Sequence, residues 1–272
     1  MVEKSRKAMV NRSGLINIDT ADTATLERKI TAMREGGKIL GNLLRDLKNY
    51  VKPGMTGKQI DAWVRKEIVA RGAEVAYDML DDEFPGAICI SINDGLVHGA
   101  PTDEVLEEGD KVSFDLDIYY KGYFTDSAFT MLVGDTGSPA VKKMISVTES
   151  SLWEGIEQVK PGAHIGDIGA AVEKVLRKGH LGVIENYIGH GIGKTMHEEP
   201  AVPNYGKRGH GYKLVEGDTI CIEPMSCLGK PANYTDKNDG WTARMKDGSI
   251  GCHCEHTVLV TSTGYEVLTL PD

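Results

Sequence analysis

The chain has 272 residues, of which 40% are hydrophobic, enough to bury a sizeable core as one large domain or two small ones. Its formal net charge of −9 argues against a general nucleic-acid-binding surface, and it has no run of about 18 apolar residues to span a membrane. The opening residues, MVEKSRKAMVNRSG, lack the apolar run of a signal peptide. Five cysteines, an odd number in a chain too large to need disulfide staples, favour a reducing cytoplasm.

In chain order, residues 1–24 are expected to form a short N-terminal tail, and a long helix follows. Its apolar residues recur at helical spacing, at Ile30, Met33, Leu40, Leu44 and Leu47. Pro53-Gly54 separates this helix from the next. Strand-like runs are AICISI (87–92), KVSFDLDIYY (111–120) and CHCEHTVLVT (252–261). The segment LGKPANYTDKNDG (228–240) is expected to be a loop-like insert that the first half of the chain lacks.

The chain also contains an internal repeat. The tetrapeptide VKPG occurs from Val51 and again from Val159, 108 positions later, and matches continue into the following helix. At the same offset EGDKVSFD aligns with EGDTICIE, so that Asp115 falls opposite Glu223. Repeats of this length indicate a duplicated half-domain rather than a solenoid. We therefore expect an α+β fold, a single catalytic domain over 25–272 made of two related halves, about 25–135 and 136–272, with helices outside.

A site where the halves meet would draw carboxylates from both. Strand alternation places Asp115 on one face with Ser113 and Asp117. A carboxylate buried on an apolar strand is costly unless a cation or an ion pair compensates it, and a salt-bridged or half-exposed strand is the alternative. A hairpin near Lys121-Gly122 could bring Asp126 to Asp115, although such an aspartate is more often found in a turn or on an edge strand. We expect Asp117 to support the site indirectly or to face solvent.

In the last strand, alternation places His253, Glu255 and Thr257 on one face and Cys252, Cys254 and His256 on the other. A structural zinc site usually needs Cys-x-x-Cys pairs, and the sequence has none here. The cysteines are therefore expected to pack in the core. Glu255 is the one acidic residue of this strand. Asp115 is likewise the charge that stands out in its own strand.

The stretch YIGHGIGKTMHEEP surrounds His190 with glycines, which allow close backbone approach or positive φ, and presents its imidazole on a constrained loop. A hydrogen-bonded core or surface histidine is the ordinary alternative. Four strand carboxylates without a counter-charge favour a metal ligand instead. Such donors suit a pair of divalent cations of the manganese, iron or cobalt type better than a thiolate-rich zinc site. Two such cations activate a water and polarise a carbonyl.

Five spaced motifs carry a family resemblance. They are SINDGLVHGAP, FDLDIYYKGYFTD, GHGIGKTMHEEP, IEPM and CEHTVLVT, and the chain from about Thr25 to Leu270 resembles a type I methionine aminopeptidase. The resemblance implies the pita-bread fold, with a central curved antiparallel sheet and a pseudo-twofold axis. It implies a hydrolase that removes the N-terminal methionine of nascent proteins and peptides through a metal-activated water.

The resemblance also assigns residue roles. Its implied metal ligands are Asp115, Asp126, His190, Glu223 and Glu255, with Asp126 and Glu255 bridging two ions. His98 would contact the substrate near the scissile nitrogen, and His197 would contact the carbonyl and stabilise the developing oxyanion. Glu223 would also move a proton from the water to the leaving amine. Glu198 and Glu199 are not ligands in the family and are expected to hydrogen-bond within their loop.

The implied methionine pocket draws on Phe84, Cys89, Met196 and Trp241, although each could equally be ordinary core. Two positions depart from commoner relatives: Asp81 stands where many bacterial members have tyrosine, and Met196 where phenylalanine is usual. The expected partners are peptides and nascent chains with N-terminal methionine, in transient proximity to the ribosome. We expect a cytoplasmic monomer without a nucleic-acid or membrane site.

Two rival readings follow from the same residues. An X-Pro aminopeptidase or dipeptidase shares the fold and the metal ligands, but such enzymes usually carry a long additional N-terminal domain. A non-catalytic binding protein of this fold would usually have lost metal ligands, whereas every ligand position here is filled. The sequence therefore favours a methionine aminopeptidase over both rivals.

Overall fold

The fold is described from a computed structural model, which describes residues 23–80 and 83–272. Most of the expected tail and Asp81 lie outside this range. The helices are α1 (Thr23–Tyr50), α2 (Gly57–Ala70), the short 3-10 helix η3 (Ala76–Met79), α3 (Pro139–Ile156) and α4 (Ile165–Lys178). Helix α1 thus begins slightly before the predicted end of the tail. None of the helices in the described part is both long and apolar enough to cross a membrane.

The strands are short except for one long hairpin. They are β1 (Glu74–Val75), β2 (Cys89–Ile92), β3 (Gly95–Val97), β4 (Lys111–Tyr120), β5 (Tyr123–Leu132), β6 (Gly182–Val183), β7 (Gly189–Gly191), β8 (Glu198–Val202), β9 (Thr219–Ile222), β10 (Met225–Cys227), β11 (Asn233–Thr235), β12 (Ala243–Met245), β13 (Gly251–His253), β14 (His256–Val260) and β15 (Tyr265–Val267). They form antiparallel sheets in the orders β1-β4-β2 with β5 on β4, β13-β10-β6, β11-β12-β3 and β15-β14-β9-β7-β8.

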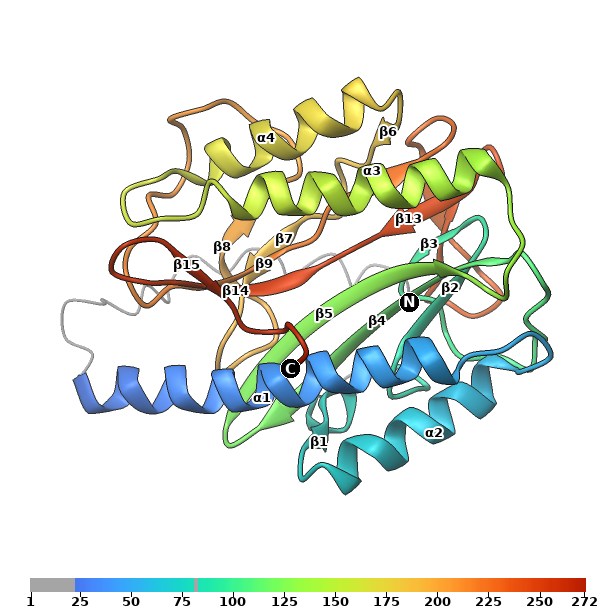
Figure 1. Ribbon diagram of the computed structural model, residues 1–272, viewed down its shortest axis with the longest axis horizontal. Coiled ribbons are helices and arrows are strands. Elements are labelled where there is room, and N and C mark those ends of the chain that lie inside the picture. Colours follow the sequence, from blue (N-terminus) through green and yellow to red (C-terminus); the bar gives the residue numbers. More distant parts are fainter. Residues whose placement is uncertain (1–22, 81–82) are drawn as a thin grey trace.

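The helices lie on the outside and the strands between them (Figure 1). Helices α1 and α2 cover the β4–β5 side, whereas α3 and α4 cover the side of β9, β10 and β13. The C-terminus returns to α1, where the Asn42 side chain exchanges hydrogen bonds of 3.0 and 3.1 Å with Asp272. The sheets are therefore shielded on both outer faces and meet in the middle of the molecule.

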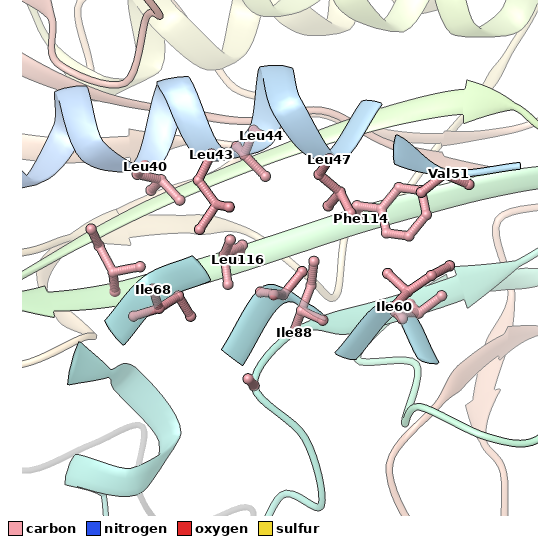
Figure 2. Packing of buried hydrophobic residues seen from close by; sticks show 14 of the residues in the cluster. Leu40, Leu43, Leu44, Leu47, Val51, Ile60, Ile68, Ile88, Phe114 and Leu116 are labelled. Carbon is pink, nitrogen blue, oxygen red and sulfur yellow. The ribbon is translucent and has the colours of Figure 1, made fainter. Parts of the chain in front are cut away.

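One hydrophobic core fixes α1 and α2 against β4. Figure 2 shows Leu40, Leu43 and Leu47 of α1 facing Phe114 and Leu116 of β4. All of these side chains are fully buried, and the helical spacing of the leucines explains why one face of α1 can do this. Burying each such side chain contributes about 1.5–3 kcal/mol. This core holds β4, the strand that carries Asp115, in place.

The internal repeat is visible in the structure. Helices α2 and α4 are each 14 residues long and begin at equivalent positions, Gly57 and Ile165. In both, the side chain of the third helical residue, Gln59 or Asp167, accepts a hydrogen bond from the backbone N–H of the N-cap residue, Thr56 or His164. The preceding turns match as well, since Gly54 and Gly162 have φ of 91° and 84°. Each of these glycines donates its N–H over 2.8 Å to a leucine carbonyl, Leu106 or Leu214. The duplicated sequence therefore builds the same local unit twice.

The β4–β5 hairpin turns where the sequence predicted. Lys121 and Gly122 both have positive φ, 49° and 92°, as a two-residue hairpin turn requires. The register pairs Asp117 with Asp126 and Asp115 with Ala128. Asp126 therefore lies directly opposite Asp117 and diagonally across from Asp115, all on one face of the hairpin.

The two halves are joined across β5 and the segment between β13 and β14. Ala128 and Glu255 exchange backbone hydrogen bonds of 2.9 and 3.3 Å. The Thr257 hydroxyl accepts a hydrogen bond from the backbone N–H of Asp126 and donates one to the Asp126 carbonyl. The prediction of one continuous strand over 252–261 is wrong. The strand breaks at Cys254 and Glu255, because its backbone partners change there from β10 to β5.

The predicted loop-like insert at 228–240 also needs correction. Residues 233–235 form β11, which pairs with β12 and so extends the sheet that contains β3. After it, the Asp239 carboxylate accepts hydrogen bonds from the backbone N–H groups of Trp241 and Thr242 at 2.8 and 3.0 Å. This side-chain turn fixes the backbone of Trp241.

Lys111 is a fully buried cation at the start of β4. Its Nζ donates to the carbonyls of Ser91 and Gly95 at 3.0 and 2.8 Å, and so ties down the turn between β2 and β3. Burial lowers the pKa of Lys111 from 10.5 to about 8. Between these two pH values the unfolded chain therefore binds more protons than the folded protein. The loss of folding stability caused by burying the charge is complete below pH 8, and it disappears as pH rises towards 10.5.

We expect this cost to appear when Lys111 is replaced by methionine. Between pH 7 and 10 the free energy of unfolding of the wild type should rise by about 2–3 kcal/mol relative to Lys111→Met, because only the wild type sheds this penalty. Urea unfolding across the pH range measures the difference, with the exposed Lys52→Met as the control. A difference that does not change with pH would contradict the lowered pKa.

Candidate metal centre

The predicted site residues come together around one cavity of about 170 Å³. Its walls include the predicted residues Phe84, Cys89, His98, Asp115, Asp126, His190, Met196, His197, Glu223, Trp241 and Glu255. They come from both halves of the chain and are separated by up to 171 positions in sequence. The wall also includes Tyr77, Leu80, Val97 and Asp117, none of which was assigned a place in the cavity from the sequence.

The first half supplies a buried acidic face. Ligand atoms of Asp115, Asp117 and Asp126 lie within 4.8 Å of one another. Oδ1 of each has no hydrogen-bond partner among the described residues. Burial raises the pKa of all three carboxyls well above the usual range, and their mutual repulsion raises it further. Asp117 is buried in this cluster, so the expectation that it might face solvent is wrong.

The second half adds Glu223 and Glu255. Glu223 follows β9 and is held by Asn204, whose buried Nδ2 donates to the Glu223 carbonyl at 2.9 Å. Glu255 lies at the break between β13 and β14 and is 1% exposed. Burial, and then the neighbouring Asp126, raise the pKa of both carboxyls well above the usual range. Each half therefore contributes buried acids that face those of the other.

His190 lies on β7, a short strand rather than the loop expected from the sequence. Side chains at Gly189 or Gly191 would clash with the carbonyls of Cys221 and Glu199, so glycine is required for β7 to pair closely on both sides. Neither glycine needs positive φ. His190 Nε2 lies 3.5 Å from Glu223 Oε1 and 3.8 Å from Asp126 Oδ2. Burial, together with His197, lowers the pKa of His190 to about 3, so its ring is neutral.

This donor set fits divalent cations. Several buried carboxylates facing one another are unfavourable without a positive charge, and their unpartnered oxygens are available to coordinate one. A neutral imidazole adds the nitrogen ligand. Ligand atoms of Asp126, His190, Cys221 and Glu255 also lie within 4.8 Å of one another. Burial raises the pKa of the Cys221 thiol well above its usual range, and its Sγ lies 3.7 Å from the Thr257 hydroxyl.

Two further histidines stand at the mouth of the cavity. His98 and His197 are exposed, in contrast to the buried carboxylates. His98 follows β3 with φ of 58° and packs edge-on against Tyr187, with ring centroids 5.5 Å apart. The rings of His190 and His197 are 4.4 Å apart. The two imidazoles thus lie where a bound molecule would enter.

An apolar lobe adjoins the acidic cluster. The Phe84 ring contacts Tyr77 and Trp241, at centroid distances of 4.5 and 5.3 Å, and the Tyr77 hydroxyl lies 3.2 Å from Cys89 Sγ. Met196 is also buried here. Phe84, Cys89, Met196 and Trp241 therefore line a cavity rather than only filling the core. Tyr77 could not be found from the sequence, because the η3 residues match neither a strand nor an amphipathic helix.

His253 also lies in the site. Strand alternation predicts that it shares a face with Glu255, but it was not among the predicted site residues. It is 1% exposed and lies within 3.9 Å of Asp115, Glu223 and Glu255. The available signal was its shared strand face with Glu255. The neighbouring Cys252 and Cys254 belong to the hydrophobic core on the opposite face, which confirms that they are packing residues.

Known proteins resemble this chain in sequence and in fold. The sequence model of metallopeptidase family M24 matches residues 31–262. Methionine aminopeptidase A from Synechocystis sp. is 41% identical over 253 residues, which cover 92% of this chain and 98% of that protein. The crystal structure of methionine aminopeptidase from Rickettsia prowazekii has a TM-score of 0.86 at 36% identity, and the match covers 90% of this chain and 98% of that one.

A more distant neighbour shares only the fold. The prolidase from Pyrococcus furiosus has a TM-score of 0.71 at 22% identity, and the match covers 90% of this chain but 65% of the prolidase. Together these structures confirm the predicted α+β pita-bread fold with two pseudo-symmetric halves. The exact boundary between the halves, near residue 135, remains a prediction.

Proposed function

This chain belongs to metallopeptidase family M24, and on that premise we propose that it is a methionine aminopeptidase, which removes the N-terminal methionine from peptides and nascent proteins. The observation that carries the proposal is the buried cluster of acids and imidazole from both halves, with an apolar lobe on one side and two histidines at its mouth. Relatives named methionine aminopeptidase match nearly the whole length of this chain.

Two divalent cations of the manganese, iron or cobalt type are proposed for the acidic cluster. Asp115, Asp126, His190, Glu223 and Glu255 would hold them, and Asp126 belongs to both groups of candidate ligand residues. When bound, such ions supply an activated water and polarise the scissile carbonyl. Oxygen donors with one imidazole suit these metals.

The remaining residues act on the substrate. Glu223 would also carry a proton from the attacking water to the leaving amine. His98, at the mouth, would contact the substrate beside the scissile nitrogen. His197 would donate to the carbonyl oxygen as negative charge develops on it, a contact that strengthens in the transition state.

The apolar lobe is proposed to hold the methionine side chain. Phe84, Met196, Trp241 and the Tyr77–Cys89 pair offer aromatic and sulfur contacts that suit a flexible thioether. The Phe84 ring is tilted by 35° to that of Tyr77 and lies edge to face with that of Trp241. A small apolar lobe of this kind supports selectivity for the first residue of the substrate peptide.

An X-Pro peptidase is not favoured. The match to a methionine aminopeptidase covers 98% of that chain at 36% identity, whereas the prolidase match covers 65% of its chain at 22% identity. We propose a monomeric enzyme that acts in the cytoplasm on chains emerging from the ribosome. The five buried free cysteines support a reducing compartment.

The test is release of free methionine from a Met-Ala-Ser peptide by protein stripped of metal and reloaded with Mn²⁺. We expect the reloaded protein to release methionine and the stripped protein to release none. The reloaded protein should not cleave an X-Pro peptide. Asp115→Ala should lose the activity, while Asp103→Ala, which removes an exposed aspartate paired with Lys58, should keep it. Cleavage of the X-Pro peptide without methionine release would contradict the proposal.

A further inference from the structure

His253 occupies an unusual position for a residue outside the proposed ligand set. Its side chain is 1% exposed, and neither ring nitrogen has a hydrogen-bond partner among the described residues. Three carboxylates surround it: Nδ1 lies 3.9 Å from Asp115 Oδ2, and Nε2 lies 3.6 Å from Glu223 Oε2 and 3.7 Å from Glu255 Oε2. A buried polar group without a partner is costly, so this placement calls for a role.

Glu223 lies between two imidazoles. Its Oε1 faces His190 Nε2 at 3.5 Å, and its Oε2 faces His253 Nε2 at 3.6 Å. The two carboxylate oxygens are thus directed to different partners. A carboxylate that coordinates a cation through one oxygen commonly accepts a hydrogen bond on the other, and this bond fixes its orientation. His253 stands where that donor is needed, and its Nε2 is nearly as close to Glu255.

The backbone of His253 is held firmly. Its N–H and carbonyl both bond the Thr130 hydroxyl, at 3.2 and 2.6 Å, and this hydroxyl also lies 2.7 Å from the Ser113 hydroxyl. Met225, two residues after Glu223, pairs with His253 across β10 and β13. The backbone of His253 is therefore anchored to β5 of the first half, which carries Asp126, and to β10 of the second half, which follows Glu223. Such an anchor suits a residue that positions others.

We propose that His253 is a positioning residue of the metal centre: its Nε2–H is the donor that orients Glu223 and Glu255 for cation binding. The proposal rests on the metal-dependent function above. The present distances exceed a hydrogen bond by about 0.5 Å, so a small rotation of either carboxylate closes the contact. Direct metal coordination by His253 is the competing arrangement, and the experiment separates the two.

The experiment measures Mn²⁺ affinity by calorimetry for the wild type, His253→Gln and His253→Leu. Glutamine keeps an N–H donor, whereas leucine fills the space without one. We expect leucine to weaken the affinity by about 10–100-fold and glutamine to restore most of it. Circular dichroism and thermal unfolding of the metal-free proteins check the fold. Electron spin-echo spectroscopy of Mn²⁺-loaded wild type, which depends on no variant, should detect one coordinated imidazole.

Several results would overturn the proposal. Unchanged affinity in His253→Leu, or equal losses in the glutamine and leucine variants with intact folds, would exclude a donor role. Two coordinated imidazoles in the wild type would assign His253 as a ligand instead. Failure of the wild type itself to bind Mn²⁺ would overturn the proposed metal centre together with this role, whereas the other results would overturn the role of His253 alone.

Discussion

Replacing Asp126 by asparagine should abolish methionine release while making the metal-free protein more stable. Asp126 lies at the centre of the acidic cluster, within reach of Asp115, Asp117 and His190. Asparagine keeps the shape of the side chain but not the charge that the proposed cations need. Loss of a residue that only supports a ligand costs about 10–100-fold in metal affinity or activity, so we expect at least about 100-fold here.

The expected gain in stability, in contrast to the loss of activity, has a physical cause. Burial, and then Asp117, raise the pKa of Asp126 in the folded protein. An aspartate with a raised folded-state pKa destabilises the fold at neutral pH, and the penalty is absent only below its unfolded value, 3.8. The variant removes this charge and keeps the backbone bonds to Thr257. The free energy of unfolding of the metal-free protein should rise by about 1 kcal/mol or more.

Activity assays and chemical unfolding, each with and without Mn²⁺, measure both effects. Asp103→Asn is the matched control, since this aspartate is exposed and distant from the cavity. It should change neither property appreciably. A metal-free Asp126→Asn protein less stable than the wild type would show that the acidic cluster is not under repulsion, and retained activity would remove Asp126 from the ligand set.

The second large effect is expected for His197→Ala. The imidazole of His197 lies at the mouth of the cavity beside His190, outside the acidic cluster. If it stabilises the developing oxyanion, its loss should lower kcat by about 10²–10³-fold and leave KM and Mn²⁺ affinity close to wild type.

Steady-state kinetics and calorimetry separate these parameters. His210→Ala is the control, because His210 is exposed and its Nδ1 lies 3.0 Å from the backbone carbonyl of Arg208. A fall in Mn²⁺ affinity equal to the fall in kcat would instead make His197 part of the metal centre. An increase in KM alone would limit its role to substrate binding.

Much of this molecule was predictable from its sequence. Apolar spacing marked α1, and the offset repeat marked α2 and α4 as equivalent and paired Asp115 with Glu223. The Lys-Gly turn placed Asp126 near Asp115. These features depend on local periodicity and turn chemistry, which neighbouring residues along the chain determine.

The tertiary structure alone decided the rest. It broke the last strand at Glu255, made β7 a strand because glycine lets two neighbours approach, and buried Asp117 in the acidic cluster. It also brought Tyr77 to Cys89 and His253 between three carboxylates. Periodicity along the chain gives the face on which a side chain lies, but its partners come from segments distant in sequence. Only the packing of both halves specifies those partners.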